Sequence, residues 1–181
     1  MDKLNPLPIH FVDLETTALT PVQGEIIEIC ILTSLDWGYT ISDVYHKKVK
    51  PVHLHTANPE ALQVNGYTDG DHDTEPTWAE IKNTVSDILS TGVICAHNAI
   101  FESSWLNYYC NQSITHRFMC TQTLVYAHLP LRSASMQGVR QCLGWSEEGA
   151  HTAYVDAYDV YRLFRLLLVE PTMADDETDT T

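Results

Sequence analysis

Apolar residues along the chain follow strand-like and helix-like patterns in turn, which predicts an α/β fold. Three apolar segments, 9–15, 25–35 and 41–49, are separated by short turns and predict an antiparallel meander. Two shorter apolar segments, 93–98 and 118–120, predict two further strands. Because helical patterns precede each of the last two strands, we expect one mixed five-stranded sheet flanked by helices.

Helices are predicted between and after these strands. Asn58, Pro59 and Gly66 have the order of an N-cap, a first helical residue and a helix-ending glycine. Other segments have the apolar spacing of amphipathic helices. The predicted helices are 58–66, 77–91, 99–110, 121–128, 135–143 and 152–169. With no internal repeat and no linker, we expect a single domain over residues 1–171.

The acidic composition limits the partners that the surface can bind. The chain has 181 residues, 44% of them hydrophobic, and a formal charge of −14. Residues 172–181 contain four acids and are expected to form a disordered tail, and the rest of the chain still carries about ten excess negative charges. This balance argues against a broad phosphate-binding surface, so contacts with nucleic acid should be local and assisted by metal ions.

Cysteine usage and hydropathy favour a soluble cytoplasmic protein. The five cysteines are widely spaced without a Cys-x-x-Cys pair, which suggests neither a disulfide framework nor a zinc site. The N-terminal residues contain no basic region followed by a long apolar segment, and no segment approaches 18 apolar residues. We therefore expect no membrane partner.

Two carboxylates interrupt the first predicted strand. Asp13 and Glu15 alternate with Val12 and Leu14, so they share one face at roughly 6.6 to 7 Å along the strand. Two like charges at this distance repel each other, and removing them from water costs more free energy unless a positive charge lies between them. A divalent cation is the simplest partner for such a pair.

Two further acids lie where apolar residues are expected. Asp156 falls in the apolar stripe of the final helix, and Glu102 begins the helix after the strand at 93–98. If they meet Asp13 and Glu15, four carboxylates could hold two divalent ions about 3.5 to 4 Å apart, as in phosphodiester hydrolysis.

His151 lies just ahead of the final helix, five residues before Asp156. Within one helix this spacing would place the two about 140° apart. On an incoming loop, however, His151 could swing over the metal site, where an imidazole titrating near neutrality is a reasonable general base for a metal-bound water.

Three segments in order resemble one family. DLETT at 13–17, AHNAIFE at 96–102 and HTAYVDA at 151–157 are similar to the three exonuclease motifs of the DEDD superfamily, in its DEDDh branch. This branch includes DnaQ-like proofreading subunits and ribonuclease T. The segment at 58–68 is also similar, and the resemblance extends over roughly 9–168. It implies a ribonuclease H-like fold and 3′ to 5′ hydrolysis that releases nucleoside 5′-monophosphates from single-stranded or frayed ends.

The resemblance also assigns roles to residues. Asp13, Glu15 and Asp156 would hold the tighter of two Mg²⁺ or Mn²⁺ ions, with Asp13 bridging to the second ion. Glu102 would act on the second ion, and His151 would be the base. The terminal nucleotide would be held by Thr16, Thr17, Ala18, Leu19, Asn98 and Phe101.

At two positions the chain departs from the family pattern. Glu102 stands where the family usually has Asp, so we expect retained activity with an altered metal preference. Ala18 stands where the family usually has Gly. It can still present its backbone N–H, provided that the local turn does not require a positive φ.

Each candidate also has a purely structural interpretation. The two strand acids and Asp156 could face solvent, and Glu102 could be an acid favoured by the helix dipole. We interpret Glu28 as a structural strand residue. The remaining alternatives are capping for Asn98 and His151 and core packing for Phe101.

Two other metal sites have weak support in the sequence. His53 and His55 alternate near a strand end without a third ligand, which disfavours zinc. Acids at 69, 71, 73 and 80 have calcium-loop spacing, but Thr74 occupies the glycine position and Pro76 interrupts the loop. A solvated acidic loop is favoured.

The sequence therefore predicts a metal-dependent 3′ to 5′ exonuclease. The rival hypothesis is a catalytically silent module of the same fold that binds nucleic-acid ends or a protein. A third is a proofreading subunit associated with a polymerase, and a homodimer is conceivable from the resemblance to ribonuclease T.

Overall fold

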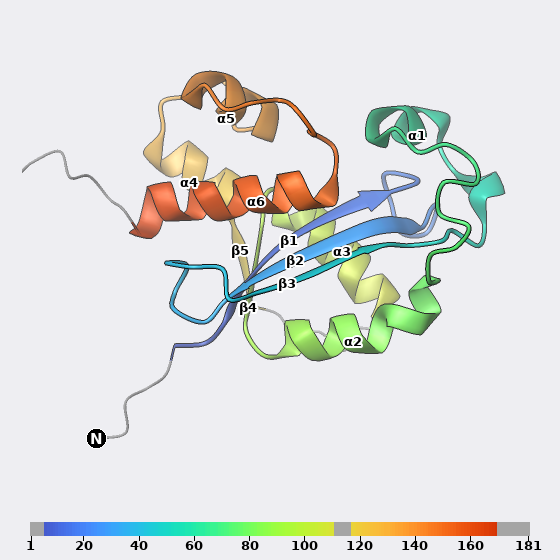
Figure 1. Cartoon of the computed structure of the whole chain (residues 1–181). Helices are drawn as coiled ribbons and strands as arrows, with labels where there is room; N and C mark the ends of the chain where they lie inside the picture. The colour runs from blue at the N-terminus through green and yellow to red at the C-terminus, as the bar shows by residue number, and fades with distance from the viewer. Residues whose placement is uncertain (1–5, 111–116, 170–181) are drawn as a thin grey trace, which may run out of the picture.

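The computed structural model describes residues 6–110 and 117–169, in which a five-stranded sheet lies between helices (Figure 1). The predicted tail at 172–181 lies outside the described residues. The strands are β1 (Ile9–Thr16), β2 (Ile26–Ser34), β3 (Asp43–Lys48), β4 (Val93–Ala96) and β5 (Phe118–Cys120). All five were predicted, and their bounds differ from the predicted ones by at most two residues.

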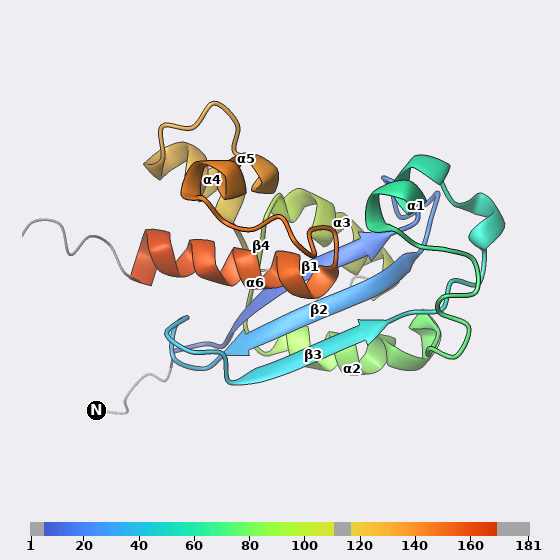
Figure 2. The same ribbon diagram turned by 45° about the horizontal axis from the view of Figure 1, so that its top comes forward.

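The sheet has the order β3-β2-β1-β4-β5, with β1 at its centre. The first three strands form the predicted antiparallel meander, whereas β4 pairs parallel to β1 and β5 parallel to β4. The mixed sheet is therefore confirmed. Figure 2 shows β3 at the open edge, where its residues are mostly exposed.

Two layers of helices bury the two faces of the sheet. On one face, α2 (Trp78–Ser90) and α3 (Ala99–Tyr109) cover apolar residues of β1, β2 and β4, including Val12, Ile29 and Ile94. On the other, α6 (Ala153–Phe164) crosses β1 and β2 (Figures 1 and 2). Burying apolar surface on both faces is the main favourable contribution to folding, and it places α6 directly over the central strand.

Two smaller parts complete the fold. The helices α4 (Thr121–His128) and α5 (Met136–Leu143) pack beside α6 around Val125, Val139 and Leu163. At the C-terminal end of β1 lie η1 (Leu54–Thr56) and α1 (Pro59–Asn65). The backbone N–H of Asn58 donates to Thr17 O at 2.7 Å, and Asn65 Nδ2 donates to Thr16 O at 3.0 Å. These bonds attach α1 to the end of β1.

The helix ends largely follow the predicted signals. Asn58 caps α1 by accepting from Glu60 N, Pro59 is its first residue, and Gly66 ends it at φ +70°. The final helix differs from the prediction, because α6 ends at Phe164 and continues as a π-helical segment, η2 (Arg165–Val169).

All five cysteines lie in the described part of the chain and none forms a disulfide. Within the same part, every helix is too short or too polar to cross a lipid bilayer.

Phe164 holds α6 on the sheet, which leads to a prediction about stability. Its side chain is fully buried, with ring centroids 5.2 Å from Phe11 and 6.1 Å from Trp37. Phe164→Ala should lower the free energy of unfolding by about 3–5 kcal/mol, measured by urea denaturation, because it leaves a cavity between helix and sheet. Leu166→Ala, at a residue that is 40% exposed, should cost less than about 1 kcal/mol. Equal losses would show that Phe164 does not hold α6.

Candidate active site

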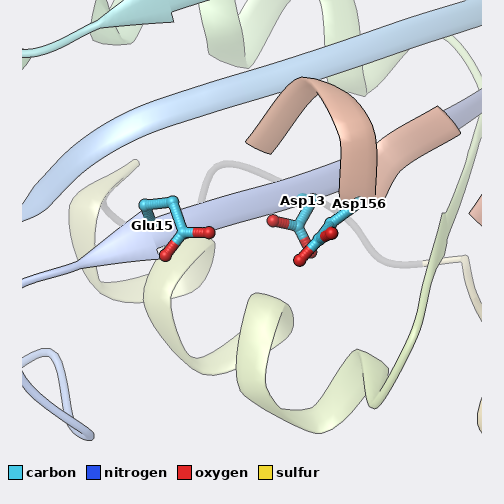
Figure 3. A group of neighbouring side chains, drawn as sticks. All are labelled: Asp13, Glu15 and Asp156. Atoms are coloured by element: carbon cyan, nitrogen blue, oxygen red, sulfur yellow. The ribbon is translucent and has the colours of Figure 1, made fainter. Parts of the chain in front are cut away.

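Asp13 and Glu15 leave the same face of β1 near its C-terminal end (Figure 3). Their neighbours Val12 and Leu14 point to the other face and are buried in the core beneath α2 and α3. The strand pairing becomes irregular between Glu15 and Thr16, where β1 ends. Strand alternation alone therefore separates the two acids from the apolar core and turns them toward α6.

Asp156 reaches these acids from the first turn of α6 (Figure 3). The helix is held over β1 by fully buried Ala153, Ala157 and Val160, which lie along the same stripe as Asp156. One carboxylate oxygen from each of Asp13, Glu15 and Asp156 lies within 4.8 Å of the other two. Three acids from two distant segments thus meet in one place.

Glu102 lies beside this group rather than within it. It sits in the first turn of α3 and is only 3% exposed, and among the described residues its Oε2 has no hydrogen-bond partner. Its charge raises the pKa of Asp13, so it is close to the group. Four carboxylates were predicted to meet. Three of them do, and the fourth, Glu102, lies beside them on α3.

The acids disturb one another's ionisation. Loss of hydration, and then the charges of Asp156 and Glu102, raise the pKa of Asp13 well above its usual range. Loss of hydration and the charges of Asp156 and Glu28 raise the pKa of Glu15 to about 8. Burial likewise raises the pKa of Glu102. Without a bound cation, Glu15 therefore favours its protonated form at neutral pH, and the pKa values of Asp13 and Glu102 are shifted in the same direction.

A divalent cation fits this group of residues. The available donors are carboxylate oxygens, which suit Mg²⁺ and Mn²⁺ better than sulfur-preferring metals. The unpartnered Oε2 of Glu102 is a buried acceptor for which the described residues supply no donor. A bound cation would reduce the repulsion among these acids and favour their ionised forms. It would also give the buried Oε2 of Glu102 a positive charge nearby.

Arg140 is a member of the site that the sequence analysis did not identify. Its guanidinium, 3% exposed, donates from Nη2 to Asp156 Oδ1 and from Nε to Asp159 Oδ2, the latter at 2.7 Å. Arg140 lies on α5 next to the buried Val139. The sequence did contain a signal for it: Arg140 is a charged residue on the apolar face of a helix, as Asp156 is on α6.

Glu28 and His46 extend the acidic face across the sheet. Glu28 pairs with Glu15 in the strand register, and His46 Nε2 lies 2.6 Å from Glu28 Oε1. The ring of Tyr154 on α6 lies 5.8 Å from that of His46. Glu28 was interpreted as a structural residue, and it is not one of the three clustered acids, but it contributes to the raised pKa of Glu15.

A pocket of about 260 Å³ opens beside Glu15 at the end of β1. Its walls come from β1 and the following turn, from α1 and from α3. Most of its lining is apolar, with carboxylates at Glu15 and Glu60. The lining residues are Leu14, Glu15, Thr16, Ala18, Leu19, Asn58, Glu60, Ala61, Val64, Asn65 and Phe101.

The predicted nucleotide-binding residues divide into two sets. Thr16, Ala18, Leu19 and Phe101 line this pocket. The side chain of Thr17 does not, because it is buried and accepts from Glu25 N at 2.8 Å. Asn98 does not line the pocket either; it is exposed at the N-cap position of α3, with φ +66° and no side-chain cap bond.

Ala18 fits its position without backbone strain. It is absent from the described non-glycine residues with positive φ, so the turn does not require glycine there. Its methyl group is accommodated by Gly24, where an added Cβ would lie 2.6 Å from the Cβ of Ala18. Gly24, across the turn, therefore leaves the space that the methyl group of Ala18 occupies.

His151 lies on the loop before α6, as predicted. It is exposed, has φ +63°, and its ring makes no hydrogen bond or ion pair with any described residue. The backbone conformation is unusual for a non-glycine residue. No contact joins the imidazole to the three clustered acids.

Neither alternative metal site forms. Over the described residues, the group of Asp13, Glu15 and Asp156 is the single cluster of three possible ligands, so the acids at 69–80 do not converge. Glu80 instead completes the capping box of α2 with Thr77, and Asp73 pairs with Lys50 at 3.3 Å. His53 Nδ1 lies 3.4 Å from Glu25 Oε1. Neither His53 nor His55 belongs to a group of three possible ligands among the described residues.

This mixed five-stranded sheet flanked by helices is a ribonuclease H-like fold. The RNase T family model, described as Exonuclease, matches residues 11–164. The chain therefore belongs to this exonuclease family.

The DNA polymerases that are similar to this chain are much longer than it is. PolC-type DNA polymerase III of Thermotoga maritima is 28% identical over 156 residues, which is 84% of this chain and 11% of the polymerase. The polymerase of the same type from Thermotoga petrophila matches to the same extent. The chain thus spans about a tenth of the length of these relatives.

Solved structures with the same fold include E. coli exonuclease I in complex with a dT13 oligonucleotide. It has a TM-score of 0.79 and 15% identity, and the match covers 91% of this chain and 41% of that one. A 3′-exonuclease described in the 3′-end-specific recognition of a histone mRNA stem-loop has a TM-score of 0.68 and 18% identity, covering 88% of this chain and 63% of that one.

The raised carboxyl pKa values lead to a prediction for pH. The pKa of Glu15 rises from 4.5 to about 8 on folding, so ionisation favours the unfolded chain and the metal-free protein should lose stability as the pH rises toward 8. Asp13 and Glu102 act in the same direction. The melting temperature in EDTA should fall between about pH 6.5 and pH 8, and added Mg²⁺ should raise it more at the higher pH.

The chosen pH range avoids the opposing effect of His10 on stability. Burial lowers the pKa of His10 from 6.5 to about 4, which makes stability increase with pH below 6.5. Glu15→Gln removes one of the titrating groups and should flatten the slope above pH 7. A melting temperature independent of pH in wild type would contradict the raised pKa values.

Proposed function

We propose that this chain is a metal-dependent 3′ to 5′ exonuclease of the DEDDh type, acting on single-stranded or frayed ends and releasing nucleoside 5′-monophosphates. The observation that supports this most is the meeting of Asp13, Glu15 and Asp156 within 4.8 Å, beside a pocket large enough for a nucleoside. Membership of the exonuclease family is consistent with it.

The acids would hold two Mg²⁺ or Mn²⁺ ions. Asp13, Glu15 and Asp156 would bind the tighter ion, and Glu102 would act toward the second from α3. When bound, such ions activate a water and stabilise the leaving oxygen of a phosphodiester. Glu102 is one methylene longer than Asp, so its reach from α3 supports the proposed change in metal preference.

His151 would be the general base. Its exposed imidazole lies on the loop leading into α6, three residues along the chain from Tyr154 and five from Asp156. No described residue holds the ring in another position, so rotation of its side chain is unrestricted by hydrogen bonds. An imidazole in this position can accept a proton from the attacking water.

The pocket beside Glu15 would receive the terminal nucleoside. Leu19 and Phe101 offer apolar surfaces for a base, while the backbone between Thr16 and Leu19 offers polar groups for the sugar. Because a paired base cannot enter such a pocket, unpaired 3′ ends would be preferred. The charge of −14 predicts weak, distributive binding unless a partner supplies basic residues.

A second candidate function is proofreading in association with a polymerase. It is favoured by one observation, the 28% identity to a segment of PolC-type DNA polymerase III. In that arrangement the polymerase would supply basic residues beside this acidic chain. Co-purification of a polymerase with the tagged chain would support it.

The exonuclease proposal predicts the effect of removing one acid. Asp13→Asn should reduce release of 5′-mononucleotides from a 3′-labelled single-stranded oligonucleotide by at least about 100-fold, because the central ligand of the site loses its charge. EDTA should abolish release by wild type. Glu102→Ala should also slow release, with a different ratio of rates in Mg²⁺ and Mn²⁺.

The matched control is Asp43→Asn, the same substitution at an exposed position of β3. It should leave the rate unchanged within about two-fold. If wild type releases no mononucleotide from DNA or RNA in either metal, the enzyme proposal is wrong and the silent binding module is favoured.

A further inference from the structure

A buried guanidinium contacts one of the three clustered acids and none of the others. Arg140 donates to Asp156 through Nη2 and to Asp159 through Nε. The two acids are three residues apart on α6, so they lie on neighbouring positions of one helix side. Arg140 therefore bridges two carboxylates of α6 from the facing helix α5.

This bridge is held on every side. The side chains of Arg140 and Asp159 are 3% and 4% exposed, and Asp159 also accepts from Arg162 Nη1 at 3.1 Å. The start of α5 is fixed as well, since His97 Nε2 lies 2.7 Å from the carbonyl oxygen of Ala134. Buried charges persist only when paired and bonded in this way, which leaves the guanidinium little freedom to move.

Arg140 does not stand where a metal ion would bind. A cation among the three clustered acids would contact Asp13 and Glu15 as well as Asp156. Among the described residues, however, the ion pairs of Arg140 are with Asp156 and Asp159 alone. The guanidinium therefore lies on the Asp159 side of Asp156, outside the space that the three acids share.

We propose that Arg140 is a positioning residue of the metal site: anchored by Asp159, it holds one oxygen of Asp156 and so keeps that carboxylate turned toward Asp13 and Glu15. The inference rests on the proposed function, because it assumes that these acids bind a divalent ion. Without the anchor, repulsion from the other acids would turn the Asp156 side chain away. Hydrogen-bond partners of metal ligands typically contribute 10- to 100-fold in metal affinity.

Orientation and charge have opposite consequences, which makes the inference testable. If Arg140 acted only as a nearby positive charge, removing it would tighten cation binding. If it positions Asp156, removing it weakens binding despite the lost repulsion. Lysine separates the two effects further, because it retains the charge but lacks the planar fork that bonds both acids.

The experiment measures Mn²⁺ affinity by electron paramagnetic resonance at a temperature well below the melting point of each variant. Arg140→Met and Arg140→Lys should each weaken Mn²⁺ binding by about 10- to 100-fold. Arg162→Met is the matched control, since it removes the same charge from a 38% exposed partner on the other oxygen of Asp159, Oδ1, and leaves the buried bonds of Arg140 to Asp159 Oδ2 and to Asp156 in place. Its Mn²⁺ affinity should stay within about three-fold of wild type.

Asp159→Asn provides a second variant if the Arg140 variants do not fold. It leaves Arg140 in place but loosens its anchor, and it should also weaken Mn²⁺ binding. Unchanged or tighter binding in Arg140→Met, or wild-type affinity in Arg140→Lys, would overturn the positioning role while the proposed function stands. Absence of Mn²⁺ binding by wild type would instead overturn the metal site itself.

Discussion

Repulsion among carboxylates at the end of β1 is the constraint on which the rest of the site depends. Asp13 and Glu15 are brought together by strand geometry, and the packing of α6 adds Asp156 to them. Folding therefore concentrates negative charge in a place with restricted hydration. The apolar packing of α6 against the sheet supplies the favourable free energy that opposes this repulsion. A bound cation would relieve this repulsion, and we expect that relief to be the source of the site's affinity for cations.

The surrounding residues distribute this charge in different ways. Arg140, which Asp159 anchors, pairs with one oxygen of Asp156 inside the protein, and His46 contacts Glu28 on the neighbouring strand. Glu102 has no such partner, which leaves one buried acceptor directed to no donor among the described residues. The acids without a basic partner among the described residues thus lie around Asp13, and the pocket of about 260 Å³ opens next to them, at Glu15. The negative charge and the pocket therefore lie side by side at the end of β1.

Much of this arrangement could be predicted from the sequence because it follows local periodicity. Alternation in β1 separates Asp13 and Glu15 from Val12 and Leu14, and the helical stripe of α6 singles out Asp156. Strand register is not local, so the pairing of Glu28 with Glu15 could not be foreseen. The role of Arg140 depends on how α5 packs against α6, which helical periodicity does not specify. The end of α6 at Phe164 also lacks a glycine or proline signal, and the predicted helix ran on to Val169.

Diffraction from a crystal grown with Mn²⁺ would show directly whether the clustered acids bind a cation. Anomalous scattering locates manganese independently of any assumption about activity. We expect a manganese peak bound by oxygens of Asp13, Glu15 and Asp156, with Arg140 still paired to Asp156. Manganese found only elsewhere on the protein, with these three carboxylates unliganded, would contradict it.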